Sequence, residues 1–167
     1  VNLCQADVER LFGEGYQLTE HHQITGAFVA NERVCLIGPK KTMQRVAILG
    51  PARKETQIEI SLTDARSLGV EAKLRLSGNL AGTNGMQIST EDGSVVIDVD
   101  HGVIAAKRHL HCSDADAEEL GIKTGDIVKL AVATENERNL VFDDVEVRVG
   151  GPGSVVHIDT DEGNACG

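Results

Sequence analysis

The stretch that decides the fold is Arg108-His109-Leu110-His111-Cys112-Ser113-Asp114-Ala115-Asp116-Ala117-Glu118-Glu119-Leu120. We predict that it joins a β-strand to a short α-helix. Residues two apart on a strand point to the same face, so His109 and His111 would present two imidazoles side by side, which suits one divalent metal. The alternative is two polar residues on a half-exposed strand, because a lone His-x-His motif is not specific.

The second half of this stretch carries the signals of a helix start and a helix end. Ser113 stands three residues before Asp116, which is typical of an N-cap followed by an acidic first turn. Gly121 follows Leu120 directly and predicts the end of the helix. If the strand continues through Cys112, that side chain points away from both imidazoles, so we do not expect it to bind the metal.

The composition favours a β-rich fold with an aliphatic core. The chain has 167 residues, of which 41% are hydrophobic, but it holds only three Phe, one Tyr and no Trp. Its 18 glycines and many β-branched residues suggest short strands joined by tight turns. Short strands separated by single-turn helices indicate β-barrels or small sandwiches and not a parallel α/β sheet.

Charge and cysteine usage exclude several classes of protein. A net charge of −10 argues against non-specific binding to nucleic acid or to an anionic membrane. No apolar run approaches the ~20 residues that span a bilayer, and no signal-peptide pattern opens the chain. The four cysteines are widely spaced and form no Cys-x-x-Cys motif, so we expect a cytoplasmic protein with reduced thiols.

Periodicity and turn residues predict the other elements. We predict strands at 34–37, 45–49, 57–60, 94–99, 103–106, 127–132, 141–149 and 155–158, and short helices at 5–11 and 63–68. Residues 17–32, with the adjacent His21 and His22, are predicted to be solvated loop, and so are residues 77–86. Gly50-Pro51 is expected to end its strand. Residues after 158 are expected to form an acidic turn.

The strand–helix unit of the opening stretch recurs twice. In each copy a predicted cap residue lies seven positions before a leucine, and a glycine follows: Ser113 and Leu120, Ser61 and Leu68, Cys4 and Leu11. The recurrence predicts three equivalent strand-to-helix turns.

One position in each copy carries a potential ligand. Two residues before the three caps stand His111, Glu59 and Asn2, each with a nitrogen or oxygen donor at the end of a predicted strand, where sites are usually built. Two copies packed about a pseudo-two-fold axis would bring Glu59 and His111 together. The alternative is three ordinary turns with unrelated polar residues.

Residues 38–54 form a basic segment in an acidic chain. They include Lys40, Arg45 and Arg53, and contain no acidic residue. Lysine and arginine clusters of this kind bind phosphate groups. We therefore predict a phosphate-binding role for them, the alternative being a solvated hairpin.

Three motifs resemble those of the phosphate propanoyltransferase family, and the resemblance covers nearly the whole chain. The first is Gly50-Pro-Ala-Arg-Lys-Glu-Thr-Gln-Ile-Glu-Ile-Ser-Leu-Thr-Asp-Ala65. The second combines Arg108-His-Leu-His111 with Leu120-Gly-Ile-Lys-Thr-Gly-Asp-Ile-Val128. The third is His157-Ile-Asp-Thr-Asp-Glu-Gly-Asn-Ala165.

The resemblance implies a fold and an activity. The fold would be mainly β, with two β-barrels capped by short helices, pseudo-duplicated, the active site at their interface, and approximate halves 1–100 and 101–167. Such a phosphotransacylase exchanges the coenzyme A of a short acyl-CoA, propionyl-CoA or acetyl-CoA, for phosphate, with two divalent metals, usually zinc. The resemblance also implies a homodimer, and for many members a place in the lumen of a bacterial microcompartment among its shell proteins.

The resemblance also implies roles for individual residues. Glu59, His109, His111 and His157 match metal ligands. Arg53 matches the arginine beside the metals and is the expected catalytic residue. A further residue, Asn164, matches a contact to coenzyme A, whose phosphates are also the expected partners of the basic segment.

The chain departs from the family pattern at its start. Val1-Asn2-Leu3 stands where the family has Arg-His-x-His-Leu, so Asn2 replaces one ligand and the other histidine would precede residue 1. Either the chain is truncated there, or one metal is bound weakly or not at all. An alternative function is therefore a catalytically impaired paralogue that binds coenzyme A or one metal. A third is a generic double-psi-type barrel module, because the motif that ends at Val128 occurs in unrelated binding domains.

Overall fold

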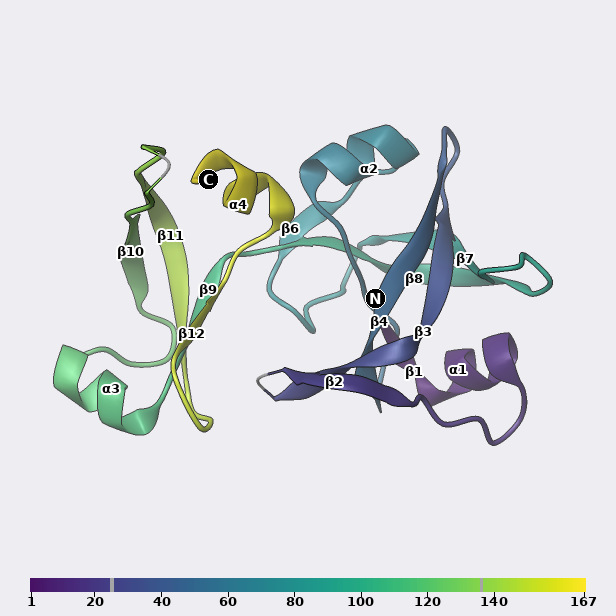
Figure 1. The fold of residues 1–167 in the computed structure, drawn as a ribbon, viewed down its shortest axis with the longest axis horizontal. Helices are drawn as coiled ribbons and strands as arrows, with labels where there is room; N and C mark the ends of the chain where they lie inside the picture. Colours follow the sequence, from purple (N-terminus) through teal and green to yellow (C-terminus); the bar gives the residue numbers. More distant parts are fainter. Residues whose placement is uncertain (25, 136) are drawn as a thin grey trace. The chain divides into compact units, whose positions relative to one another are not determined.

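The structure, a computed structural model, describes residues 1–24, 26–135 and 137–167. The chain divides after residue 105 into two compact units, Val1–Ala105 and Ala106–Gly167. Both are mainly β, and each contains two short helices (Figure 1). Among the described residues, no helix is long and apolar enough to cross a membrane.

The first unit is built on an eight-stranded sheet. Its elements are β1 (Asn2–Cys4), α1 (Gln5–Phe12), β2 (Glu20–Ile24), β3 (Ala27–Ile37), β4 (Thr42–Arg53), β5 (Ile58–Glu59), α2 (Leu62–Leu68), β6 (Lys73–Arg75), β7 (Asn84–Thr90) and β8 (Val96–Ala106). The strand order is β1-β4-β3-β7-β8-β5, with β2 beside β3 and β6 beside β8.

The second unit is built on a four-stranded sheet. Its elements are β9 (His109–Cys112), α3 (Asp114–Leu120), β10 (Ile127–Val132), β11 (Leu140–Val149), β12 (Val155–His157) and α4 (Thr160–Ala165). The strand order is β10-β11-β9-β12. β9 is parallel to β11 and antiparallel to β12. β12 is an edge strand, because it stands at the end of this order.

The mainly β class is confirmed, whereas closure into two barrels is not. In the first unit, an isolated bridge between Asn2 and Gln57 links β1 to the residue before β5, the two ends of the sheet order. Across the described residues no continuous strand ladder closes either sheet. The pair of barrels therefore stays a prediction.

The predicted loop at 17–32 is wrong. β2 and the first part of β3 form an antiparallel hairpin there, and β7 begins at Asn84 within the second predicted loop. His21 and His22 are exposed as predicted, but they lie on β2. Because all five side chains of β2 are exposed, this strand needs no alternation of apolar residues, and the pattern that would have revealed it is absent.

The predicted strand end at Gly50-Pro51 is also wrong, because β4 continues through a cis peptide bond to Arg53. The pairing of β4 with β3 reaches Gly50, opposite Phe28, and beyond it β4 continues beside β1. Pro51 thus lies outside the β3–β4 ladder. Within that ladder an N–H donor would be needed, and proline has none. A larger residue at position 50 would force the Phe28 ring to move, since a Cβ there would lie 2.1 Å from that ring.

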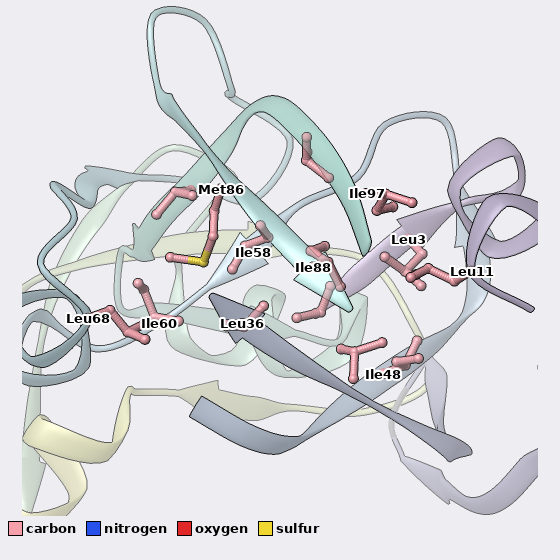
Figure 2. Packing of buried hydrophobic residues seen from close by; sticks show 14 of the residues in the cluster. Leu3, Leu11, Leu36, Ile48, Ile58, Ile60, Leu68, Met86, Ile88 and Ile97 are labelled. Carbon is pink, nitrogen blue, oxygen red and sulfur yellow. The ribbon is translucent and has the colours of Figure 1, made fainter. Parts of the chain in front are cut away.

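The core of the first unit is aliphatic, as the composition predicts. Figure 2 shows leucine and isoleucine side chains from several strands and helices pointing toward one another. Leu36, Ile48, Ile58 and Ile88 are fully buried there. Tight packing of such branched side chains makes the core sensitive to loss of volume.

Leu36→Ala is expected to lower the free energy of unfolding by about 2–5 kcal/mol, because it removes a fully buried side chain and leaves a cavity. Urea denaturation followed by circular dichroism measures the change. Leu74→Ala is the matched control, since Leu74 is 55% exposed and should lose little. Equal losses in the two variants would contradict this account of the core.

Candidate metal centre

Three imidazoles meet on one face of the four-stranded sheet. His109 and His111 are two residues apart on β9, and β12 places His157 directly opposite His109. The ring centroid of His109 lies 5.0 Å from that of His111 and 4.8 Å from that of His157. The ring centroids of His111 and His157 are 5.1 Å apart. The predicted strand therefore brings His109 and His111 together. The pairing of β12 with this strand brings His157 to them from a distant segment.

The donor set of this cluster fits a divalent metal. One ligand nitrogen from each ring can be chosen so that all three lie within 4.8 Å of one another. Three imidazole nitrogens suit zinc and several other transition metals. The ring of His109 is held in place, since its Nδ1 lies 2.8 Å from the carbonyl oxygen of Lys107. A carbonyl only accepts, so Nδ1 carries the proton and Nε2 keeps its lone pair for a metal.

The surroundings of His111 favour its neutral form. Burial lowers its pKa from the ordinary 6.5, and the neighbouring His109, His157 and Arg148 lower it further. A neutral imidazole is the form that binds a metal.

Cys112 lies on the other face of β9, as predicted. Its side chain is 0% exposed and packs in a small apolar cluster with Ala117 and Val147. In the part of the chain that the structure describes, the group of potential ligands does not include it. All four cysteines are free thiols, which agrees with the expectation of reduced cysteines.

The repeat places its three caps where the sequence predicts them. α1, α2 and α3 begin directly after Cys4, Ser61 and Ser113. The Ser61 and Ser113 side chains each accept a hydrogen bond from the amide three residues on, whereas Cys4 makes no such bond. The turn is therefore recurrent in its backbone, and the capping hydrogen bond is confined to the two serine copies.

In the first unit, Glu59 belongs to a polar cluster with Asn2 and Gln57. Asn2 and Gln57 exchange two backbone hydrogen bonds of 2.8 and 2.7 Å, and the Gln57 amide donates to the Glu59 carboxylate. Asn2 is only 1% exposed, yet within the described part of the chain neither polar atom of its side chain has a partner. A buried amide without partners is costly.

Arg53 and Arg45 are both exposed and make different contacts. Arg53 donates to the Ser77 hydroxyl over 3.1 Å. Arg45 forms an exposed ion pair of 3.1 Å with Glu91, which compensates part of its charge. Lys40 lies in the turn between β3 and β4 and is exposed. The roles predicted for these three residues stay predictions.

Known proteins resemble this chain along its whole length. A family model described as phosphate propanoyltransferase matches residues 1–167. The chain belongs to the phosphate propanoyltransferase family. A phosphate propanoyltransferase of Thermotoga maritima is 48% identical over 169 residues, which are 99% of this chain and 79% of that protein. One of Clostridioides difficile is 45% identical over 170 residues, which are 100% of this chain and 79% of that protein.

Membership of the phosphate propanoyltransferase family implies a phosphate acyltransferase activity. The family model matches the segment that contains the three-histidine cluster, and it also covers Glu59 and Arg53. Glu59 lies in the first unit, and the histidines lie in the second. Their predicted convergence on one site stays a prediction.

The C-terminal family motif folds into a helix that the sequence prediction missed. After His157, Asp159 caps α4: its side chain accepts from the Glu162 amide, and the Glu162 side chain accepts from the Asp159 amide. The signal was present as Asp-x-x-Glu, one form of a capping box. Glu162 also pairs with Arg108 over 2.7 Å, which ties α4 to the residue before His109. Asn164 is exposed on this helix.

Asp159→Ala is expected to raise the exchange rate of the α4 amides about fivefold, because loss of an N-cap costs about 1 kcal/mol. Hydrogen exchange followed by NMR measures the rate at Gly163, whose amide donates to the Asp159 carbonyl. Asp161→Ala is the control, since it removes the same charge from the first turn but no cap. Equal rates in the two variants would contradict a capping role for Asp159.

Proposed function

We propose that the chain interconverts a short-chain acyl-CoA, propionyl-CoA or acetyl-CoA, plus phosphate with the acyl phosphate plus coenzyme A. Family membership supports the phosphate acyltransferase class. The observation that carries the metal-assisted form is the convergence of His109, His111 and His157. A divalent metal, which we propose to be zinc, would polarise a thioester carbonyl and orient phosphate when bound there.

The residues of the cluster are prepared to hold a metal. The Lys107 carbonyl fixes the ring of His109, and the lowered pKa of His111 keeps that ring unprotonated near neutral pH. His157 comes from another strand, so the three donors surround a common position and do not lie in one row. Preorganised ligands of this kind raise metal affinity.

Arg53 is the proposed catalytic residue. Its guanidinium carries a fixed charge and a fork of donors that matches phosphate oxygens. It would hold phosphate or stabilise the oxyanion that develops when the thioester carbonyl is attacked. Lys40, Arg45 and Asn164 are proposed to contact phosphate or coenzyme A, which agrees with the exposure of all three side chains.

Direct transfer is the proposed reaction course. A phosphate oxygen forms a bond to the acyl carbon, the carbon–sulfur bond breaks, and coenzyme A leaves as the thiolate. No side chain needs to carry the acyl group. Cys112, the thiol nearest in sequence to the histidines, is fully buried on the opposite face of β9, which argues against its use as a nucleophile.

The alternative is an impaired paralogue that binds coenzyme A or a single metal. The buried side-chain amide of Asn2, which has no partner among the described residues, favours it, because an amide is a poor zinc ligand. The Glu59 carboxylate, moreover, already accepts from Gln57. Metal content separates the two functions. Two metals per chain support the enzyme, and one or none supports the paralogue.

The test of the enzyme is thiol release from acetyl-CoA and propionyl-CoA, with and without phosphate and with and without added zinc. We expect release that depends on phosphate and that falls when a chelator removes the metal. No release under any of these conditions would reject the enzyme.

Other family-level expectations are also proposals. We propose a pair of β-barrels with approximate halves 1–100 and 101–167, a homodimer, and a cytoplasmic location or the lumen of a microcompartment with shell proteins as partners. Size-exclusion chromatography with light scattering tests the dimer.

A further inference from the structure

The third histidine of the cluster depends on a very short edge strand. β12 has three residues and, within the described residues, pairs with β9 alone, with Val155 opposite His111 and His157 opposite His109. Side chains alternate along a strand, so a slip of one residue would turn His157 to the other face of the sheet. A strand of this length has few ladder hydrogen bonds of its own to fix its register.

Ser154, the residue before β12, forms hydrogen bonds at the C-terminal end of β9 and at the start of α3. Its hydroxyl oxygen accepts from the Ser113 amide over 3.0 Å, and its hydroxyl donates to the Asp116 carboxylate. The Cys112 sulfur lies 3.7 Å from the same hydroxyl. At the start of the same loop, the Gly150 amide donates to the Cys112 carbonyl over 2.9 Å.

Asp116 links Ser154 to the start of α3, because it forms hydrogen bonds with both Ser113 and Ser154. Its amide donates to the Ser113 hydroxyl as part of the cap of α3, while its carboxylate accepts from Ser154. These two hydroxyls, Ser154 first, hold the pKa of Asp116 below its usual value. The carboxylate is therefore charged at neutral pH, and hydrogen bonds to a charged acceptor are stronger than those to a neutral one.

We propose that Ser154 is a positioning residue for the three-histidine cluster. By joining the start of β12 to the cap of α3, it fixes the register in which His157 faces His109 and His111. The inference rests on the proposed function in one respect, namely that the cluster binds a metal. The position of the His157 ring does not depend on that premise.

The test is Ser154→Ala in the complete chain, with two readouts. The affinity for Co²⁺, used as a spectroscopic probe, is expected to fall roughly 10-fold, as when a group that orients a metal ligand is lost. In the metal-free protein, the NOE between the ring protons of His109 and His157, whose rings stack 4.8 Å apart, is expected to weaken or vanish. Ser154→Thr keeps the hydroxyl at an exposed position and should restore both readouts.

Thr124→Val is the matched control. It removes a hydroxyl that accepts from the Val149 amide over 2.9 Å in the same sheet, at the end of the long strand β11. It should leave both readouts unchanged.

An unchanged NOE and an unchanged Co²⁺ affinity in Ser154→Ala would overturn the proposal. An equal loss in Thr124→Val would also overturn it, because it would show a general loosening of the sheet. If the unaltered chain binds no Co²⁺, the metal-assisted function fails, and the NOE alone decides the role of Ser154.

Discussion

His111→Ala is expected to abolish metal binding at the three-histidine cluster and to remove phosphate-dependent thiol release. The substitution leaves two imidazoles, and two nitrogen ligands do not fill a zinc site. The loss should exceed the roughly 10–100-fold in metal affinity that follows loss of a supporting group. Elemental analysis after desalting measures the metal per chain, and thiol release measures the activity.

His22→Ala is the control for this prediction, because His22 is an exposed histidine on β2 in the first unit. It should keep both metal and activity. The fold should survive in both variants, since His111 is only half-buried and the apolar clusters of the second unit do not include it. Full metal content in His111→Ala would place the metal elsewhere.

Arg53→Ala is expected to lower kcat by about 10²–10³ while the protein stays folded. That is the usual cost of removing one electrostatic donor from a transition state. Arg53 is exposed and donates one hydrogen bond to the Ser77 hydroxyl at the surface, so little stability depends on it. Arg53→Lys should recover only part of the rate, because an ammonium cannot bind two phosphate oxygens in the planar geometry of a guanidinium.

Steady-state kinetics with propionyl-CoA and phosphate measure this effect. Arg66→Ala is the matched control, since it removes the same charge from an exposed position on α2. It should leave kcat within about twofold. Turnover of Arg53→Ala equal to that of the unaltered chain would remove Arg53 from the mechanism.

Local rules were sufficient for much of the candidate metal centre. Alternation along β9 places His109 and His111 on one face and Cys112 on the other, and a serine three residues before an aspartate begins α3. The third histidine of the cluster, His157, could not be derived in this way. Its place depends on the pairing of β12 with β9, a contact between segments far apart in the sequence, and only the family resemblance indicated it.

The missed features share physical causes. β2 is exposed on both faces, so no apolar periodicity marks it. Pro51 was interpreted by its usual effect, but its N–H is not needed outside the β3–β4 ladder. The bridge between Asn2 and Gln57 is likewise a contact between distant segments. Local sequence therefore does not reveal that the amide of Asn2 is buried, or that it has no partner among the residues that the structure describes.

The order in which the strands of the second unit follow one another along the chain has a thermodynamic consequence. His109 and His111 belong to its first strand, and His157 belongs to its last. Bringing all three together in the unfolded chain would close almost the whole unit into a loop, and the entropic cost of closure grows with the length of the loop. A cation would therefore bind the folded unit in preference to the unfolded chain, and it would stabilise the fold by an amount that rises with the logarithm of the free metal concentration. The free metal concentration would then set the stability of the second unit, as well as the occupancy of the three-histidine cluster.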